Sequence, residues 1–227
     1  GIDPGSTALA AELSPAEAAF LASAHRTGEG LVATSSAGRL FDVVSALLGL
    51  RSRVSYEAQA AIELEAAAAR WRRTNPEAAV PELALPHTNA LLDPGPLVRA
   101  IVAASPGSSA RSSAGSSAGA LAYAFHLALA DACADAAASV AGAHGLDTVG
   151  LSGGVFVNRI LLHATRQRLE ARGLEVLTHQ QVPANDGGLA LGQAAIGLAH
   201  LAHSPSASAT ATAGGNLSSH RGVSACV

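Results

Sequence analysis

The stretch LSGGVFVNR, residues 151–159, decides the fold class of this chain. It begins at the end of a short apolar run, residues 148–151, and leads into a helical pattern at about 158–172. A second apolar run, residues 174–178, follows that helix. The order strand, helix, strand predicts a parallel pair of strands joined by a right-handed crossover. The chain is therefore expected to belong to the α/β class.

Two glycines occupy the turn between the first strand and the helix. Gly153 and Gly154 lack a Cβ, so a ligand could approach the backbone there, and the helix N-terminus would add free N–H donors. Asn158 could supply a further hydrogen bond from the first turn of the helix. A tight strand-to-helix turn without any ligand needs the same glycines, and spacing alone supports both interpretations equally.

A second polar loop, residues 182–188 (VPANDGG), follows the second strand. Asp186 stands just before the last helix, where capping the helix is the more common role. The functional alternative is a carboxylate ligand to a divalent ion. Both loops leave the carboxyl ends of the two strands, which is where open α/β sheets bind ligands. We therefore expect one ligand crevice between the Gly153–Gly154 turn and Asp186.

A third candidate lies nearer the N-terminus, in TSSAGRLFD, residues 34–42. Asp42 falls inside a helical pattern, where a solvated carboxylate is the slightly favoured interpretation. Acidic residues can also accept a hydrogen bond from a ribose hydroxyl, as they do in dinucleotide sites. The opening residues 1–7 look like a phosphate-binding turn of actin-like ATPases, but no strand precedes them, so we interpret the match as chance.

Helices account for most of the remaining chain. Apolar spacing and capping residues predict helices over residues 15–24, 37–48, 56–73, 120–143 and 187–203. The last of these is apolar but carries Gln193 and two histidines, so it is expected to be buried and not to cross a membrane. Residues 74–96 are expected to form loop or short strand. The Ser/Gly-rich stretch 105–119 and the tail 204–227 are expected to be disordered, because their small side chains bury little apolar area.

Composition excludes several function classes. The 227 residues are 49% apolar, 3% aromatic and 14% charged, with a net charge of −3 and no lysine. No basic field exists for nucleic acid, and a Walker-type phosphate loop would need a lysine. Cys133 and Cys226 are too far apart in sequence to suggest a disulfide framework or a metal cluster, which favours a cytoplasmic protein.

Three blocks of the sequence together resemble a known family. They are TSSAGRLFDVVSALLGLRSRVSYEAQAAIELEA, LSGGVFVNRILL and VLTHQQVPANDGGLALGQA, at residues 34–66, 151–162 and 176–194. They resemble the C-terminal carbamoyltransferase domain of the hydrogenase maturation protein HypF. The resemblance implies the distal portion of an actin/Hsp70/sugar-kinase-like fold, helix-rich with a small mixed sheet. It places a lead-in at residues 1–30 and the domain at 31–203.

The resemblance also implies a reaction. Carbamoyl phosphate and ATP give carbamoyl-adenylate, and the carbamoyl group passes to the C-terminal cysteine of a HypE-like acceptor for synthesis of the cyanide ligands of [NiFe] hydrogenase. By resemblance, Asp42 contacts the nucleotide ribose, Gly153, Gly154 and Asn158 contact the nucleotide, and Asp186 is a metal ligand. The implied ions are Fe or Zn, with Mg accompanying the nucleotide. No catalytic residue is assigned.

The sequence departs from the family pattern in ways that bear on activity. Ala58 stands where the family usually has glycine, and its methyl group is expected to crowd a nearby nucleotide. The family's paired metal histidines and phosphate-loop glycines lie upstream of the matched blocks. We therefore expect this chain alone to be inactive, unless further ligands such as His126 or His179 complete the site.

Two alternatives remain open at this point. One is a related enzyme on the same fold, a tRNA threonylcarbamoyl transferase or an antibiotic O-carbamoyltransferase; the absence of a basic surface argues weakly against tRNA. The other is a degenerate, non-catalytic nucleotide-binding fragment, which Ala58 and the Ser/Gly-rich stretch favour. The VPANDGGLALGQ block, residues 182–193, favours the HypF-type enzyme.

Overall fold

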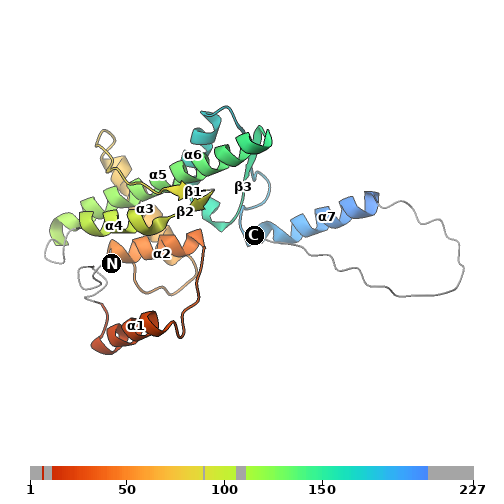
Figure 1. Cartoon of the computed structure of the whole chain (residues 1–227). Helices are drawn as coiled ribbons and strands as arrows, with labels where there is room; N and C mark the ends of the chain where they lie inside the picture. Colours follow the sequence, from red (N-terminus) through yellow and green to blue (C-terminus); the bar gives the residue numbers. More distant parts are fainter. Residues whose placement is uncertain (1–6, 8–11, 89, 106–110, 204–227) are drawn as a thin grey trace, which may run out of the picture. The chain divides into compact units, whose positions relative to one another are not determined.

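The computed structural model describes Thr7 and residues 12–88, 90–105 and 111–203 (Figure 1). The described part is rich in helices and holds two small two-stranded sheets. In chain order the elements are α1 (Pro15–Thr27), α2 (Ala37–Leu47), α3 (Gln59–Thr74), β1 (His87–Thr88), β2 (Leu91–Leu92), α4 (Pro94–Ala104), α5 (Arg111–His144), β3 (Thr148–Leu151), the 3₁₀ helix η3 (Gly154–Val157), α6 (Arg159–Glu170), β4 (Glu175–Thr178), the 3₁₀ helix η4 (Asp186–Gly188) and α7 (Leu189–His203).

The predicted start of α1 is confirmed in atomic detail. The Ser14 hydroxyl accepts a hydrogen bond from the Glu17 backbone N–H at 3.2 Å, and the Glu17 carboxylate accepts one from the Ser14 N–H at 2.8 Å. This reciprocal capping satisfies two N–H groups that would otherwise lack a partner. Helix α4 was not expected, because its prolines suggested a loop. Here Pro94 stands at the first turn, where proline is tolerated, and Asp93 caps the Gly95 N–H at 2.9 Å.

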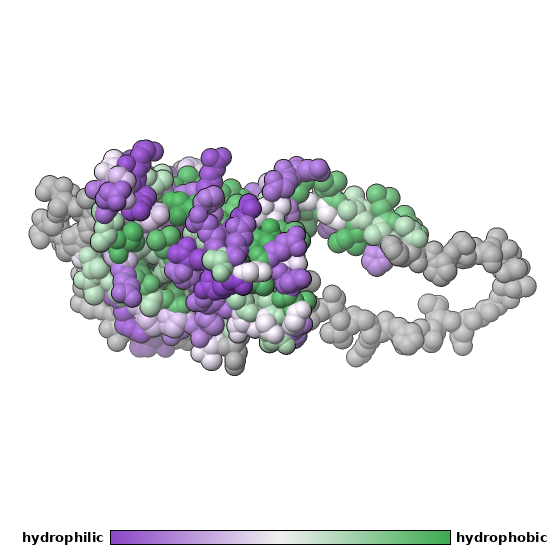
Figure 2. Space-filling view, turned by 90° about the horizontal axis from the view of Figure 1, so that it is seen from above, coloured by the Kyte–Doolittle hydropathy of each residue, from purple (hydrophilic) through white to green (hydrophobic). Residues whose placement is uncertain are grey.

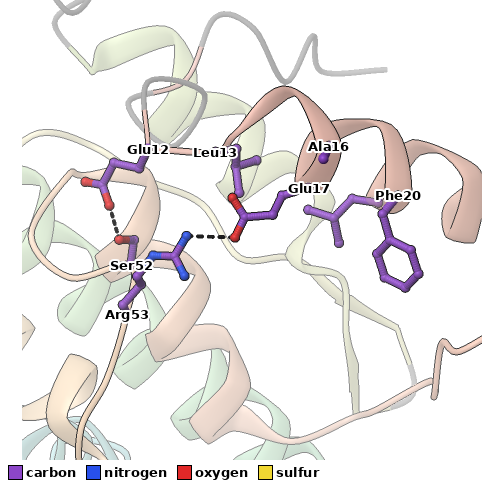
Figure 3. A pocket seen from close by; sticks show the side chains of 8 residues that line it. Glu12, Leu13, Ala16, Glu17, Phe20, Ser52 and Arg53 are labelled. Carbon is purple, nitrogen blue, oxygen red and sulfur yellow. Dashed lines mark hydrogen bonds and ion pairs between the residues drawn. The ribbon is translucent and has the colours of Figure 1, made fainter.

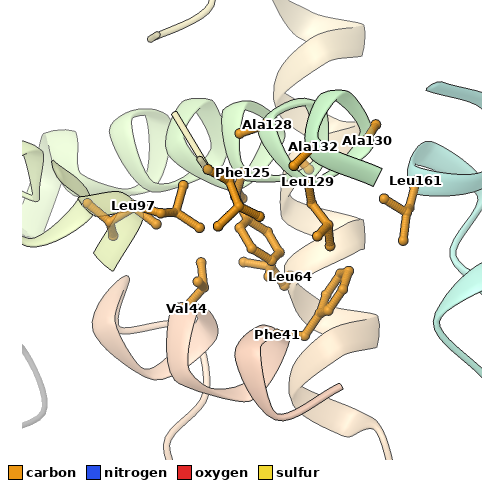
Figure 4. Close-up of a cluster of buried hydrophobic side chains, with 14 of the residues drawn as sticks. Phe41, Val44, Leu64, Leu97, Phe125, Ala128, Leu129, Ala130, Ala132 and Leu161 are labelled. Atoms are coloured by element: carbon orange, nitrogen blue, oxygen red, sulfur yellow. The ribbon is translucent and has the colours of Figure 1, made fainter. Parts of the chain in front are cut away.

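The main core forms where α5 packs against α2, α3, α4 and α6. Figure 4 shows side chains of α2, α3 and α6 converging on the underside of α5. Phe41 and Phe125 meet edge to face, with ring centroids 4.9 Å apart and an interplanar angle of 82°. The large side chains buried here are Phe41, Val44, Leu64, Leu97, Ile101, Phe125, Leu129 and Leu161. The alanines that dominate α5 let its neighbours approach its axis closely, so few aromatic residues are needed.

The predicted parallel strand pair is confirmed. β3 pairs with β4 in parallel, with Val149 opposite Val176 and Leu151 opposite Thr178. A second, smaller cluster of Ala134, Leu151 and Leu169 joins this sheet to α5 and α6. The sheet is therefore held in place by the C-terminal half of α5, and its strand ends are fixed relative to the main core.

Part of the stretch 105–119, for which composition suggested a disordered insertion, is helical. Arg111–Gly119 form the first turns of α5, while residues 106–110 lie outside the described residues. Ala118 is buried, and a Cβ added to Gly119 would lie 2.7 Å from the Cβ of Trp71 and 3.2 Å from the backbone oxygen of Ala67. Small residues here permit close contact between α5 and α3, which a composition-based argument about apolar area does not consider.

Segment Ala118–His144 of α5 is long and apolar enough to cross a membrane by those criteria alone. Half of it is buried inside the protein, against α3 and α6 among other elements. This is the pattern of a core helix.

All of helix α7 but its first residue belongs to a second unit of the chain, residues 190–227. Within this unit the helix is not buried, contrary to the prediction. Its large apolar side chains are each more than half exposed, namely Leu189, Leu191, Ile196, Leu198 and Leu201. Figure 2 shows this helix mostly in green, the colour of hydrophobic residues. Apolar composition without a polar face predicted burial but could not say what would cover the helix. The predicted disorder of residues 204–227 falls outside the described residues.

The contact between Gly119 and Trp71 makes a prediction about stability. Gly119→Ala should lower the free energy of unfolding by about 1–3 kcal/mol, because the new methyl group has to displace Trp71 or the α3 backbone. Gly142→Ala, in the same helix with no atom within 4 Å of the added Cβ, should raise it by about 0.5 kcal/mol. Urea denaturation followed by circular dichroism measures both. Equal effects of the two substitutions would contradict the packing described for Gly119.

Candidate functional site

The two loops predicted to form one crevice lie side by side. The Gly153 N–H donates to the Ala184 carbonyl at 2.8 Å, which joins the glycine turn to the loop before Asp186. Ser152 Oγ and His179 Nε2 lie 2.9 Å apart, at the carboxyl ends of β3 and β4. The structure thus brings Gly153 and the Asp186 loop to the same end of the parallel sheet, as the strand order predicted.

The glycines of the two loops are there for different reasons. Gly153 has φ +101°, a conformation that L-residues with a side chain avoid. A Cβ at Gly188 would lie 2.8 Å from the Pro183 carbonyl oxygen, so that glycine serves close packing within its own loop. Gly154 differs from both, since its φ is ordinary and an added Cβ would meet nothing within 4 Å. The packing of the described residues does not require glycine at Gly154, so the backbone there is open to close approach by a ligand.

Asp186 does not act as the helix cap that its position suggested. Asn185 has that role, and its side-chain oxygen accepts a hydrogen bond from the Gly187 N–H at 3.1 Å. The Asp186 carboxylate is exposed and has no hydrogen-bond or ion-pair partner among the described residues. It is therefore available to a ligand.

A metal ion would need more than Asp186. Within the described residues no group of three or more His, Cys, Asp or Glu side chains lies close enough to hold an ion. Stable sites normally take several protein ligands. The residues of this part of the chain therefore do not fit a complete metal site, and Asp186 could contribute at most one ligand.

Asn158 is placed differently from the prediction. It is buried and caps α6, with its Oδ1 accepting from the Leu161 N–H at 2.9 Å. Its Nδ2 donates to His126 Nε2 at 2.8 Å. The Glu65 carboxylate accepts from the Arg159 N–H at 2.8 Å. Two first-turn N–H groups of α6, those of Arg159 and Leu161, are thus bonded to protein side chains and are not free for a ligand.

His126 is fully buried on α5 between aromatic rings. Its Nδ1–H donates to the Ala122 carbonyl at 2.7 Å, which leaves Nε2 as the acceptor for Asn158. The rings of Phe41 and Phe125 lie 5.4 and 5.5 Å from the imidazole. Burial lowers the pKa of His126 from 6.5 to about 4, while the bond to the Ala122 carbonyl opposes the shift. His126 is not a metal ligand here; a lone histidine inside an Ala- and Leu-rich helix was the sequence signal for a buried hydrogen bond.

Asp42 follows Phe41 on α2, and α2 packs against η3, the 3₁₀ turn that follows Gly153. The Asp42 carboxylate forms an ion pair with Arg39 at 3.1 Å and is about one-third exposed. Because Phe41 is anchored in the core, the direction of Asp42 is fixed by that ring. Its contact with a ribose hydroxyl stays a prediction.

Ala58 has a left-handed backbone conformation, with φ +61° and ψ +9°, at the start of α3. This conformation is a physical reason to expect glycine at position 58, independent of any nucleotide. The neighbouring Gln59 and Glu63 brace the same loop: the Gln59 side chain accepts from the Ser55 N–H at 2.8 Å, and Glu63 holds Arg51 by two hydrogen bonds. These contacts keep the loop in place despite the strained residue.

A separate cavity of about 480 Å³ lies between α1 and the loop at Ser52 and Arg53 (Figure 3). Arg53 pairs with Glu17 at 2.9 Å across it, and Ser52 bonds to Glu12. The cavity is lined by Glu12, Leu13, Ala16, Glu17, Phe20, Leu21, Ser52 and Arg53. None of the predicted site residues lines this cavity, so it is distinct from the candidate site.

Comparison with known proteins gives one consistent result. Residues 4–193 match the family described as "Carbamoyltransferase, Kae1-like Domain, second subdomain". The chain belongs to the HypF carbamoyltransferase family. The carbamoyltransferase HypF of Rhodobacter capsulatus is 40% identical over 169 residues, which cover 74% of this chain and 20% of that protein. A HypF homologue of Cupriavidus necator is 39% identical over 162 residues, covering 71% of this chain and 40% of that protein.

Solved HypF structures share the fold. The structure of HypF from T. kodakarensis has a TM-score of 0.70 at 27% sequence identity and covers 88% of this chain. A full-length HypF in a phosphate- and nucleotide-bound form has a TM-score of 0.68 at 29% identity and covers 86% of this chain. The chain spans about one-fifth to two-fifths of the length of these HypF relatives, and 24% of each solved HypF chain.

The left-handed backbone at Ala58 predicts that glycine at this position would stabilise the chain. Ala58→Gly should raise the free energy of unfolding by about 1 kcal/mol, since glycine adopts positive φ without strain. Ala66→Gly, at an exposed position inside the same helix, should lower it by about 1 kcal/mol. Chemical denaturation measures both, and a loss of stability in Ala58→Gly would contradict the strain.

The low pKa of His126 predicts acid sensitivity. Below pH 6.5 the unfolded chain binds a proton at His126 that the folded chain does not bind until about pH 4, so unfolding is favoured as the pH falls through this range. The loss reaches on the order of 3 kcal/mol at pH 4. His126→Leu should show a shallower fall in unfolding free energy between pH 7 and pH 4. His163→Leu, at an exposed site on α6, should keep the wild-type slope; parallel curves for all three would refute the assignment.

Proposed function

We propose that this chain forms one wall of the nucleotide site in a HypF-type carbamoyltransferase. The observation that carries the proposal is the Gly153–Gly154 turn, which is hydrogen-bonded to the Asp186 loop and leaves open space at Gly154. Support comes from the similar HypF solved in a phosphate- and nucleotide-bound form. In this role the backbone at Gly154 lies against the nucleotide, and Asp42 accepts a hydrogen bond from a ribose hydroxyl.

The reaction proposed for the complete enzyme is transfer of a carbamoyl group. ATP, carbamoyl phosphate and water give carbamoyl-adenylate, diphosphate and phosphate. The C-terminal cysteine thiol of a HypE-like acceptor then attacks the carbamoyl carbon. The C–S bond forms as the bond to AMP breaks, and the thiol proton is lost to a base. In this proposal the resulting thiocarbamate is the source of the cyanide ligands in [NiFe] hydrogenase maturation, and the protein acts in the cytoplasm.

The described residues supply only part of the machinery for this transfer. The reacting carbon and sulfur must be held about 3–3.5 Å apart, and the developing charge must meet a metal ion or fixed donors. The loops at Gly153 and Asp186 are exposed, so their electrostatic effects are weakened by water. The Asp186 carboxylate alone cannot hold the Fe, Zn or Mg ion implied by the family. The chain by itself is therefore proposed to be inactive.

A second candidate function is a non-catalytic nucleotide-binding fragment. The observation that favours it is Ala58, whose strained backbone shows that a glycine-requiring position has accepted another residue. The related tRNA threonylcarbamoyl and antibiotic O-carbamoyl transferases have less support, because the relatives described above are named HypF and the net charge of −3 does not suit tRNA.

Open space at Gly154 allows the nucleotide proposal to be tested without unfolding the chain. Gly154→Ala should leave the melting temperature unchanged and weaken ATP binding about tenfold, because its methyl group occupies the space assigned to the ligand. NMR titration with ATP measures the affinity. Gly142→Ala, an equally open glycine at the far end of α5, should bind ATP as the wild type does. Unchanged ATP affinity in Gly154→Ala would refute this site.

Activity separates the two candidate functions. We expect no carbamoylation of a HypE-like acceptor when this chain is mixed with ATP and carbamoyl phosphate, because the reacting groups are not held together. Adding the remaining part of a HypF relative in trans should restore transfer if the chain is a working part of the enzyme. No restoration, with ATP binding intact, would favour the non-catalytic fragment. Metal-dependent turnover by the chain alone would overturn the proposal of inactivity.

A further inference from the structure

We propose that His126 is a positioning residue that acts through Asn158 to set the conformation of the glycine turn, and that neither side chain touches the nucleotide. The inference rests on the proposed function for the role of the turn. It goes beyond that proposal by giving an internal role to Asn158, which the family resemblance placed in contact with the nucleotide. Hydrogen bonds join the buried side chains of His126 and Asn158 to each other and His126 to the Ala122 carbonyl, and Asn158 ends the turn.

The hydrogen-bonding groups of the two side chains are directed at each other and at the protein backbone. His126 donates from Nδ1 to the Ala122 carbonyl at 2.7 Å and accepts at Nε2 from Asn158 at 2.8 Å. The Asn158 oxygen accepts from the Leu161 N–H at 2.9 Å. His126 is fully buried and Asn158 is 8% exposed, so water cannot replace these bonds. The side-chain oxygen of Asn158 and one of its Nδ2–H groups therefore form hydrogen bonds within the protein.

Asn158 is also the residue at which the glycine turn ends and α6 begins. Its N–H donates to the Val155 carbonyl at 3.2 Å, and its own carbonyl accepts from the Leu162 N–H at 3.0 Å. Within the turn the Phe156 N–H donates to the Gly153 carbonyl at 3.1 Å. Fixing the Asn158 side chain therefore fixes one end of the Gly153–Val157 backbone, which is the surface proposed to face the nucleotide.

The imidazole of His126 is suited to this role because it offers both a donor and an acceptor. The donor bonds to the Ala122 carbonyl and the acceptor to Asn158. The Phe41 ring packs on the same imidazole, and Phe41 directly precedes Asp42 on α2. One buried ring thus links the turn to the carboxylate proposed to bind ribose. Leucine at position 126 would keep apolar volume without either bond, and glutamine would keep an acceptor.

A double-mutant cycle on ATP affinity tests the pair. His126→Leu and Asn158→Ala should each weaken ATP binding about tenfold, and the double variant should be no weaker than either single variant, because both remove the same support. His126→Gln should recover part of the affinity. His163→Leu, exposed on α6, should bind ATP as the wild type does. Additive losses in the double variant would mean that Asn158 touches the nucleotide, and would overturn the proposal.

Two measurements need no ligand. They test whether His126 positions the glycine turn even if a variant is unstable or ATP does not bind. In the wild-type chain, ¹⁵N NMR should show His126 as the neutral Nδ1–H tautomer; an Nε2–H tautomer would overturn the proposal. In His126→Gln, amide exchange at Phe156 and Asn158 should stay within a few-fold of wild type, but in His126→Leu it should be about tenfold faster, with α3 unchanged. Equal exchange in wild type and His126→Leu would also overturn it. Failure of wild type to bind ATP would count against the proposed function alone.

Discussion

The edge-to-face contact of Phe41 with Phe125, and of both rings with the His126 imidazole, is the contact on which the rest of the molecule depends. It joins α2 to α5 at the point where α5 also supports α6. Because a packed aromatic cluster tolerates little displacement, the elements that carry Asp42 and Asn158 are held in one arrangement. In a chain with 3% aromatic residues, this cluster contributes specificity that many small alanine contacts cannot supply.

Much of the fold could be predicted because local sequence signals agree with the tertiary structure. The parallel β3–β4 pair, the capping box of Ser14 and the adjacency of the two polar loops all follow from patterns within short windows. Helix α4 and the start of α5 were missed for opposite reasons. Prolines obscured α4, and the Ser/Gly composition of residues 105–119 concealed a packing requirement that only the position of Trp71 makes visible.

The candidate site was predicted less completely, because the type of a polar residue does not reveal its hydrogen-bond partner in the folded protein. Asn158 looked like a ligand contact, yet its bonds go to His126 and Leu161. Asp186 looked like a cap, yet Asn185 does the capping and Asp186 is left exposed. Ala58 was interpreted through the nucleotide, whereas its backbone angle gives a reason that lies in the chain itself. The family resemblance named loops that the structure brings together, but it did not give the hydrogen-bond partner of each side chain within them.

The close contact between Gly119 and Trp71 also makes intrinsic tryptophan fluorescence a probe of this part of the structure. Trp71 is the single tryptophan of the chain, it is 7% exposed, and its indole lies 5.8 Å from the Tyr123 ring. Its fluorescence therefore reports the docking of the first turns of α5 on α3, while circular dichroism reports helix content throughout. If fluorescence and circular dichroism change at different denaturant concentrations, α5 separates from α3 before or after the helices unfold. Unfolding is then not a single cooperative event.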